Sequence, residues 1–235
     1  MPDLKTYLHV FDQDTIYCIR KLESDGYINQ LSGPIGSGKE SYVFLSTDHQ
    51  KRQVAVKIHR HNIESFKKIP AYLKFRGTKS GGFLKRIDDW TRYEFAFQSK
   101  AFSAGINAPE PYRLFKNVIV MQFIGENGTP ASLAVKNTNF DLQDWYAKIM
   151  GSIVKMGKRG FLHGDLSPYN ILNFNEVPYL IDFSQSLKLS GLTKEFLFRD
   201  IRNMNNWFKK LGAKEIKTES DIVREIDENL WPTET

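Results

Sequence analysis

Two acidic residues and an amide lie at short intervals in the second half of this chain, and their spacing limits the folds that can use them. The stretch His163-Gly-Asp165-Leu-Ser-Pro-Tyr-Asn170 is followed by an apolar run that ends at Asp182. One loop, a hairpin and a strand end can gather these side chains, with His163 in a structural role. Asp165 can then accept a hydroxyl proton, while Asn170 and Asp182 offer the oxygen ligands that Mg²⁺ prefers. The spacing predicts a phosphoryl-transfer site.

The glycine-rich segment upstream fits two phosphate-binding patterns, each incompletely. Residues 33–40 nearly match a P-loop, which must open a helix whose N-terminus binds the phosphates. Gly36, Gly38, Ser41 and Val43 instead follow the pattern of a glycine-rich hairpin, with Ser41 in the place of the third glycine. The residues after Ser41 favour a strand, and an acid replaces the hydroxyl that a P-loop needs. The hairpin is therefore the better prediction.

Lys57 interrupts the apolar run Val54-Ala-Val-Lys57-Ile, where a cation is expected only with an anionic partner. Glu94, on the apolar face of a helix expected downstream, is the best candidate for that partner. In this reading Lys57 also holds the α- and β-phosphates of a nucleotide. The alternative is that Lys57 reaches solvent from a strand end and Glu94 is a solvated helix charge.

Hydrophobic periodicity orders the chain into a β-rich first part and a helix-rich second part. We expect helices near residues 12–24, 88–104, 139–156, 193–211 and 218–229, and strands near 27–31, 42–45, 53–56, 112–115, 118–122, 171–174 and 178–181. Asp12 or Asp14 is expected to cap the first helix, and Asp88 or Asp89 the second. This order predicts an α+β, bilobal fold in one domain spanning 1–235, with an N-lobe over about 10–122, a hinge at 122–126 and a C-lobe over 127–235.

The strand that precedes the expected hinge ends in Met121-Gln-Phe-Ile124. Adenine could be recognised there through backbone groups of Gln122 and Ile124, with Met121 lining the back of the pocket. Core packing accounts equally well for Met121.

The bulk composition is that of an ordinary globular protein: 235 residues, 41% hydrophobic and 26% charged. No apolar run is long enough for a membrane span, and the N-terminus lacks a signal-peptide pattern. A single cysteine, Cys18, cannot form an internal disulfide, so a cytoplasmic location is expected. The net charge of +6 and the pI near 9.2 favour an anionic partner, nucleic acid before membrane.

Taken together, these segments resemble the RIO family of atypical protein kinases over nearly the whole chain. Residues 36–43, 163–170 and 181–186 carry the resemblance, and Asp-x-Ser-Gln from Asp182 is typical of that family. The pattern H-x-D-x-x-x-x-N is the catalytic loop of protein kinases. Only about 30 residues precede the glycine-rich segment, so the chain is similar to the branch without an N-terminal winged-helix domain, in a minimal version such as archaea carry.

The resemblance implies the roles of the site residues. Asp165 and Asp182 would be catalytic, Asn170 and Asp182 would bind Mg²⁺ or Mn²⁺, and Asp182 would accept phosphate transiently. The implied ATP-binding residues are Gly36, Gly38, Lys39, Ser41, Val43, Lys57, Glu94, Met121, Gln122 and Ile124. The implied activity is that of an ATP-dependent serine kinase or ATPase that acts on a small ribosomal subunit precursor, whose RNA the basic segment 60–92 would contact.

Two other functional classes stay open. One is a small-molecule phosphotransferase of kinase-like fold, and the other is a non-catalytic RNA-binding scaffold. The intact set of Lys57, Asp165, Asn170 and Asp182 argues against the scaffold. Only about 50 residues follow Asp182, so a conventional activation segment and late C-lobe helices are not expected. The oligomeric state is left open by the sequence.

Overall fold

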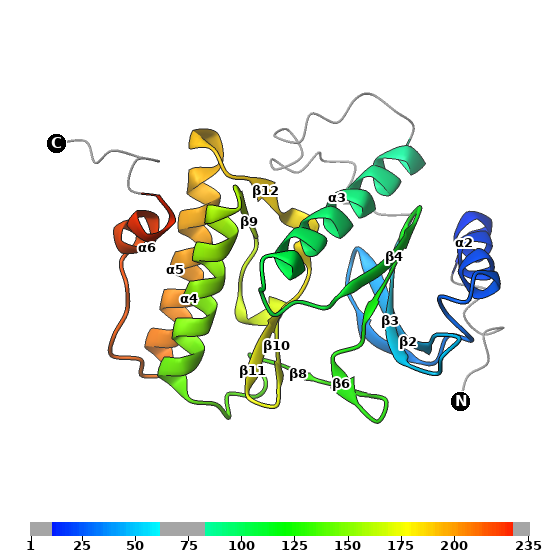
Figure 1. Ribbon diagram of the computed structural model, residues 1–235, viewed down its shortest axis with the longest axis horizontal. Helices are drawn as coiled ribbons and strands as arrows, with labels where there is room; N and C mark the ends of the chain where they lie inside the picture. Colours follow the sequence, from blue (N-terminus) through cyan, green and yellow to red (C-terminus); the bar gives the residue numbers. More distant parts are fainter. Residues whose placement is uncertain (1–10, 62–82, 228–235) are drawn as a thin grey trace. The chain divides into compact units, whose positions relative to one another are not determined.

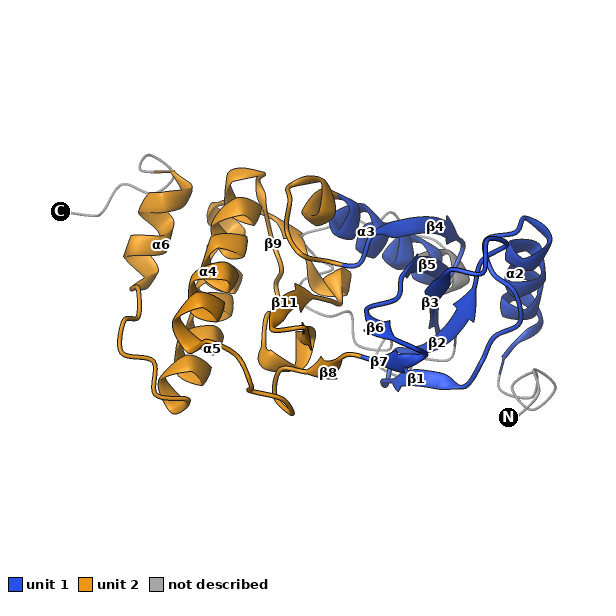
Figure 2. Cartoon of the chain, turned by 60° about the horizontal axis from the view of Figure 1, so that its bottom comes forward, with its two compact units in different colours: residues 1–99, 109–130 blue, residues 100–108, 131–235 orange. Residues whose placement is uncertain are grey.

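The computed structural model describes residues 11–61 and 83–227, and these fall into two units that each carry their own sheet and helices (Figure 2). Unit 1 comprises residues 1–99 and 109–130, and unit 2 comprises residues 100–108 and 131–235. Among the described helices, none has the length and apolar character that crossing a lipid bilayer requires.

Unit 1 is built on a five-stranded antiparallel sheet of order β1-β2-β3-β5-β4. The strands are β1 (Pro34–Ser37), β2 (Ser41–Thr47), β3 (Gln53–His59), β4 (Pro111–Phe115) and β5 (Val118–Gln122). A short hairpin of β6 (Gly125–Glu126) and β7 (Thr129–Pro130) follows. The central strand β3 is buried from Val54 to its end, which is why its sequence is a nearly continuous apolar run.

Two helices complete unit 1: α2 (Gln13–Ser24) and α3 (Phe83–Ser103), whose last residues are counted with unit 2. Asp12 caps α2 by accepting a hydrogen bond from the backbone N–H of Thr15 at 2.8 Å. The apolar face of α2 joins the sheet core through Cys18, Ile19 and Leu22. The expected helix over 12–24 and its cap are confirmed.

Two expectations for unit 1 are wrong. Residues 27–31 are not a strand: the N–H of Asn29 donates to the carbonyl of Thr47 in β2, and the next bond to β2, from Ser32 to Leu45, lies beyond the segment. The helix expected from residue 88 already begins at Phe83, so Asp88 and Asp89 lie inside α3 and do not cap it.

Unit 2 contains helices α4 (Leu142–Lys158), α5 (Lys194–Lys210) and α6 (Glu219–Ile226), and α4 packs against both others (Figure 1). Gly157 of α4 permits the contact with α6, because a Cβ there would lie 2.5 Å from the Cδ1 of Ile226. Tyr146 of α4 donates a hydrogen bond to Asn205 of α5 at 3.0 Å. The helices expected over 139–156, 193–211 and 218–229 are all present, with small shifts at their ends.

The remaining strands of unit 2 form two small sheets. One has the order β11-β10-β8, from β8 (Ser132–Leu133), β10 (Ile171–Phe174) and β11 (Val177–Leu180). The other pairs β9 (Phe161–Leu162) with β12 (Leu187–Lys188). The predicted catalytic loop, residues 163–170, therefore leaves β9 and enters β10, and Asp182 follows β11 closely. The predicted α+β fold with a β-rich first part and a helical second part is confirmed.

Candidate active site

The glycine-rich segment forms the hairpin of β1 and β2 and not a helix. Gly36 pairs with Val43, and the N–H of Gly38 donates to the carbonyl of Ser41 at 2.9 Å. Lys39 is exposed at the tip of this turn. The P-loop alternative is wrong, because the residues after the glycines continue as the strand β2 instead of opening a helix.

Lys57 and Glu94 form the ion pair that the sequence predicts. The Nζ of Lys57 on β3 lies 2.5 Å from Oε1 of Glu94 on α3, and their side chains are only 6% and 1% exposed. The alternative of two solvated charges is therefore wrong. A buried pair of this kind is strongly coupled, since removal of one partner leaves an uncompensated charge in a region of low dielectric.

His59 is a third member of this group that the sequence reasoning missed. Its Nε2 lies 2.8 Å from Oε2 of Glu94, and its side chain is 1% exposed. The sequence did contain one indication of this role: His59 lies two residues after Lys57, so both side chains are on one face of β3. We call Lys57, His59 and Glu94 the Lys57 cluster.

The residues expected to recognise adenine lie at the end of β5. The N–H of Gln122 donates to the carbonyl of Glu110 at 2.8 Å, so a backbone contact to adenine at Gln122 is limited to its carbonyl oxygen. Met121 accepts a hydrogen bond through Sδ from Gln98 at 3.4 Å, and Ile124 is buried. These contacts fit a role in core packing as well as a role in a pocket.

The catalytic loop brings Asp165 and Asn170 into contact. Nδ2 of Asn170 donates to the backbone carbonyl of Asp165 at 2.7 Å and reaches its Oδ2 at 3.3 Å. The backbone carbonyl of Asn170 accepts from the N–H of Ile181 at 3.0 Å, directly before Asp182. Gln185 reaches Oδ2 of Asp165 at 3.5 Å. The loop and the 181–185 segment are thus held together; we call Asp165, Asn170 and Asp182 the Asp165 cluster.

Asp182 has a left-handed backbone, with φ of 64° and ψ of 71°, a conformation that costs free energy for a residue other than glycine. Its carboxylate accepts from the N–H of Ser184 at 3.3 Å and caps the short turn Phe183–Gln185. His163 is fully buried, donates through Nε2 to the carbonyl of Ile181 at 3.1 Å, and lies beside the ring of Phe183. Its environment is that of a structural residue, as expected.

Helix α5 holds the backbone of the catalytic loop through three residues that the sequence reasoning did not single out. Asp200 accepts from the N–H groups of Gly164 at 2.7 Å and Leu166 at 2.9 Å, on both sides of Asp165. Arg199 donates to the carbonyl of Gly164, and Asn203 donates to that of Leu166. The sequence carried one sign of the role of Asp200: an acid on the buried face of an amphipathic helix needs hydrogen-bond donors from another part of the chain.

Gly164 is required by the close approach of the 181–185 segment. Its φ is +81°, and a Cβ at this position would lie 2.3 Å from the carbonyl oxygen of Gln185. Only glycine fits both the left-handed backbone and the contact.

Burial governs the protonation of the two acids in this region. It raises the pKa of Asp165, and the charge of Asp182 acts in the same direction, while Arg199 and Asn170 oppose it. Burial also raises the pKa of Asp200 to about 7, against the opposing effect of its two backbone donors. Asp165 is consequently a stronger base than a solvated aspartate.

The Asp165 cluster offers oxygen atoms of the kind that bind Mg²⁺. Phosphate oxygens of a nucleotide would complete the coordination of that ion. The amide nitrogen of Asn170 is used on Asp165, which leaves its oxygen as the atom able to bind a cation. Within the described residues, no group of three or more His, Cys, Asp or Glu side chains could hold a metal by itself. Mg²⁺ commonly takes one or two protein ligands together with phosphate oxygens, so the residues present fit that ion.

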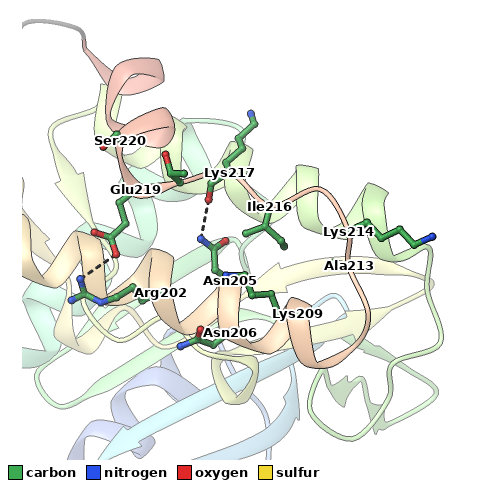
Figure 3. A pocket seen from close by; sticks show the side chains of 11 residues that line it. Arg202, Asn205, Asn206, Lys209, Ala213, Lys214, Ile216, Lys217, Glu219 and Ser220 are labelled. Carbon is green, nitrogen blue, oxygen red and sulfur yellow. Dashed lines mark hydrogen bonds and ion pairs between the residues drawn. The ribbon is translucent and has the colours of Figure 1, made fainter.

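A cavity of about 540 Å³ lies elsewhere in unit 2, between α5 and the segment that leads into α6 (Figure 3). Its lining is rich in cations and amides: Arg202, Asn205, Asn206, Lys209, Ala213, Lys214, Ile216, Lys217, Thr218, Glu219 and Ser220. Arg202 is paired with Glu219 at 3.1 Å, and Lys217 with Glu225 at 2.6 Å. None of the predicted nucleotide-binding or catalytic residues lines it.

Comparison with known proteins identifies the family. A family model described as the RIO domain matches residues 42–221. The RIO-type serine/threonine-protein kinase Rio1 of Haloferax volcanii is 34% identical over 211 residues, which cover 87% of this chain and 72% of the relative. Rio1 of Methanocaldococcus jannaschii is 35% identical over 216 residues, covering 89% and 73%.

Solved structures support the same fold. The crystal structure of the Rio2 kinase from Chaetomium thermophilum has a TM-score of 0.71 and 22% identity, covering 90% of this chain and 67% of that one. Its complex described as Rio2 kinase-ADP/Mg²⁺-phosphoaspartate has a TM-score of 0.70, covering 91% of this chain and 66% of that one. The chain thus spans about two thirds to three quarters of the length of these relatives. It belongs to the RIO family of serine/threonine-protein kinases.

Proposed function

We propose that this chain transfers the γ-phosphoryl group of Mg²⁺–ATP to a serine or threonine hydroxyl of a protein. The observation that carries the proposal is the contact of Asp165 with Asn170 beside Asp182. These residues supply a base and oxygen ligands for a cation within one loop system. The family relationship supports the choice of a protein hydroxyl over a small-molecule acceptor.

Each residue has a defined task in this proposal. Asp165 takes the proton of the attacking hydroxyl, and its raised pKa makes it a better acceptor. Asn170 and Asp182 would hold Mg²⁺, which when bound neutralises charge on the phosphates. Lys57, oriented by Glu94, holds the α- and β-phosphates. This proposal requires that the Lys57 cluster and the Asp165 cluster bind the same nucleotide.

Transfer of γ-labelled phosphate from ATP to the chain itself and to added protein substrates tests the proposal. Asp165→Asn should lower kcat by about 10²–10⁴-fold, because the amide cannot accept the proton. Asp144→Asn, an exposed surface change on α4, is the matched control and should leave kcat within a factor of two. Equal rates for the wild type and Asp165→Asn would contradict the proposal.

A second proposed output is ATP hydrolysis through a phosphorylated Asp182. A solved Rio2 relative is described as a phosphoaspartate complex with ADP and Mg²⁺. In this chain the Asp182 carboxylate would attack the γ-phosphorus, ADP would leave, and water would then cleave the acyl phosphate. Acid-quenched protein should carry label that hydroxylamine releases, and Asp182→Asn should abolish it. Label that resists hydroxylamine and persists in Asp182→Asn would contradict this route.

We also propose that the substrate is a precursor of the small ribosomal subunit in the cytoplasm. The net charge of +6 supports an RNA-containing partner. The basic segment expected to bind RNA, residues 60–92, lies largely outside the described residues and stays a prediction. Co-sedimentation with immature small subunits should weaken steeply as salt rises. Equal binding to mature and immature subunits would contradict this partner.

A further inference from the structure

In the Lys57 cluster, Glu94 accepts a hydrogen bond from His59 in addition to its ion pair with Lys57. Glu94 binds Lys57 through Oε1 at 2.5 Å and His59 through Oε2 at 2.8 Å. Each carboxylate oxygen thus has its own donor from β3. An additional donor to a buried carboxylate fixes the plane of that carboxylate, because rotation would break both bonds.

The geometry assigns a tautomer to His59. Nε2 must carry the hydrogen, because its partner Glu94 is an acceptor. The Nδ1 atom is buried and meets no hydrogen-bond partner among the described residues. His59 therefore meets Glu94 as a hydrogen-bond donor through Nε2, beside the ammonium group of Lys57.

The surroundings of His59 hold it in place from several directions. Its backbone N–H donates to the carbonyl of Asn117 at 2.9 Å, and its carbonyl accepts from Nδ2 of Asn117 at 2.8 Å. Asn117 is fully buried and also donates to Thr15. The imidazole lies beside the ring of Trp90, with centroids 5.2 Å apart. Trp90 stands one helical turn before Glu94 on α3, so the same helix supports both ends of the hydrogen bond.

We propose that His59 is a positioning residue for phosphate binding: it holds the second oxygen of Glu94, so that Glu94 keeps its orientation when Lys57 binds nucleotide phosphates. This inference rests on the proposed function of Lys57. In the nucleotide-bound state the ammonium group of Lys57 is shared between Glu94 and the phosphates. His59 is not shared, since its donor meets only the carboxylate among the contacts described.

A pair of variants at His59 separates the donor from the ring. His59→Gln places an amide N–H near the position of Nε2, whereas His59→Phe keeps an aromatic ring beside Trp90 and removes the donor. We expect His59→Phe to lower kcat/KM for ATP by about tenfold, the value of one hydrogen bond to a charged group. His59→Gln should stay within about threefold of the wild type. His49→Phe, at an exposed histidine of unit 1, is the control and should match the wild type.

A double-mutant cycle tests whether His59 acts through Glu94. In the Glu94→Gln background, His59→Phe should cost much less than its tenfold effect in the wild type. An unchanged tenfold effect there would overturn the proposal. So would equal kcat/KM for the wild type and His59→Phe.

Nitrogen NMR of the histidines provides a readout that does not depend on a variant folding. The chain has five histidines, so assignment is tractable. His59 should show a hydrogen on Nε2, and a ring that carries its hydrogen on Nδ1 only would overturn the proposal. A wild-type chain that neither binds nor turns over Mg²⁺–ATP would instead overturn the proposed function and this inference with it. A wild-type chain that turns over Mg²⁺–ATP while His59→Phe has the same kcat/KM would overturn this inference alone.

Discussion

In unit 1 the charged side chains of the Lys57 cluster bind one another, whereas in unit 2 the acids of the Asp165 cluster are held by amide and backbone groups. Lys57 and Glu94 neutralise each other at 2.5 Å. Asp165 instead meets Asn170 and Gln185, and its neighbours in the loop are fixed by Asp200. The first arrangement orients a cation, and the second fixes the loop that carries the acids proposed to act on a metal and a proton.

The difference has an energetic consequence. A mutual ion pair depends on both partners, so its loss appears mainly in stability. A loop held through its backbone can lose one catalytic side chain with little effect on its path. We therefore expect substitutions in the Lys57 cluster to change stability as well as activity, and those at Asp165 to change mainly kcat.

The largest expected stability effect is in unit 1. Lys57→Met should lower the free energy of unfolding by about 3–5 kcal/mol, because the buried Glu94 carboxylate loses the charge of Lys57. Urea denaturation measures this. The double variant Lys57→Met/Glu94→Leu should recover most of the loss, and a double variant less stable than the single one would contradict the pairing.

The next effect concerns the backbone support in unit 2. Asp200→Ala should cost about 2–4 kcal/mol, since the N–H groups of Gly164 and Leu166 are left buried without acceptors. Asp200→Asn keeps one acceptor oxygen and should cost less. Thermal unfolding compares the two, and equal melting temperatures for Asp200→Ala and the wild type would show that the loop does not need this anchor.

Stability should also depend on pH through Asp200. Its folded pKa, about 7, lies above its ordinary value of 3.8, so the folded state binds the proton more tightly than the unfolded state. The resulting stabilisation is full below pH 3.8 and is lost as pH rises towards 7. Relative to Asp200→Asn, the wild type should lose about 2 kcal/mol between pH 5 and pH 7. A difference that stays flat or grows over this range would contradict the buried, proton-binding Asp200.

A smaller effect separates two glycines of unit 2 with similar backbones. Gly164 and Gly160 have φ of +81° and +73°, but only Gly164 would bring a Cβ against the carbonyl of Gln185. Both alanine variants carry the cost of a left-handed backbone, of about 1 kcal/mol. Gly164→Ala should cost at least about 1 kcal/mol more, because the 181–185 segment must shift. Equal melting temperatures for the two variants would show that a Cβ at residue 164 does not meet the carbonyl of Gln185.

The parts of the molecule that sequence could predict are those in which a local pattern has one physical outcome. A lysine inside an apolar strand requires an acid, so the pairing of Lys57 with Glu94 was predictable. The hairpin at Gly36 followed from the strand-forming residues after it. The contact between Asp165 and Asn170 followed from their short spacing along the chain.

The parts that could not be predicted depend on distant partners or on ambiguous local signals. Asp200 contacts a loop more than thirty residues earlier, and a charged residue in a helix gives no hint of that partner. His59 shares a face of β3 with Lys57, but this spacing alone does not identify Glu94 as its partner. Residues 27–31 have strand-like composition, but the bond from Asn29 to Thr47 does not continue into a ladder with β2. Asp88 resembles a helix cap, although the helix begins earlier.

The proposed function requires that the Lys57 cluster and the Asp165 cluster bind one Mg²⁺–ATP. An acyl-phosphate derivative of ATP tests it, because it transfers its acyl group to a lysine amine beside the bound phosphates, and mass spectrometry identifies that lysine. The account predicts Mg²⁺-dependent labelling of Lys57 that excess ATP prevents and that Asp182→Asn strongly reduces. Labelling of other lysines only, or labelling of Lys57 that is indifferent to Mg²⁺ and to Asp182→Asn, would contradict it.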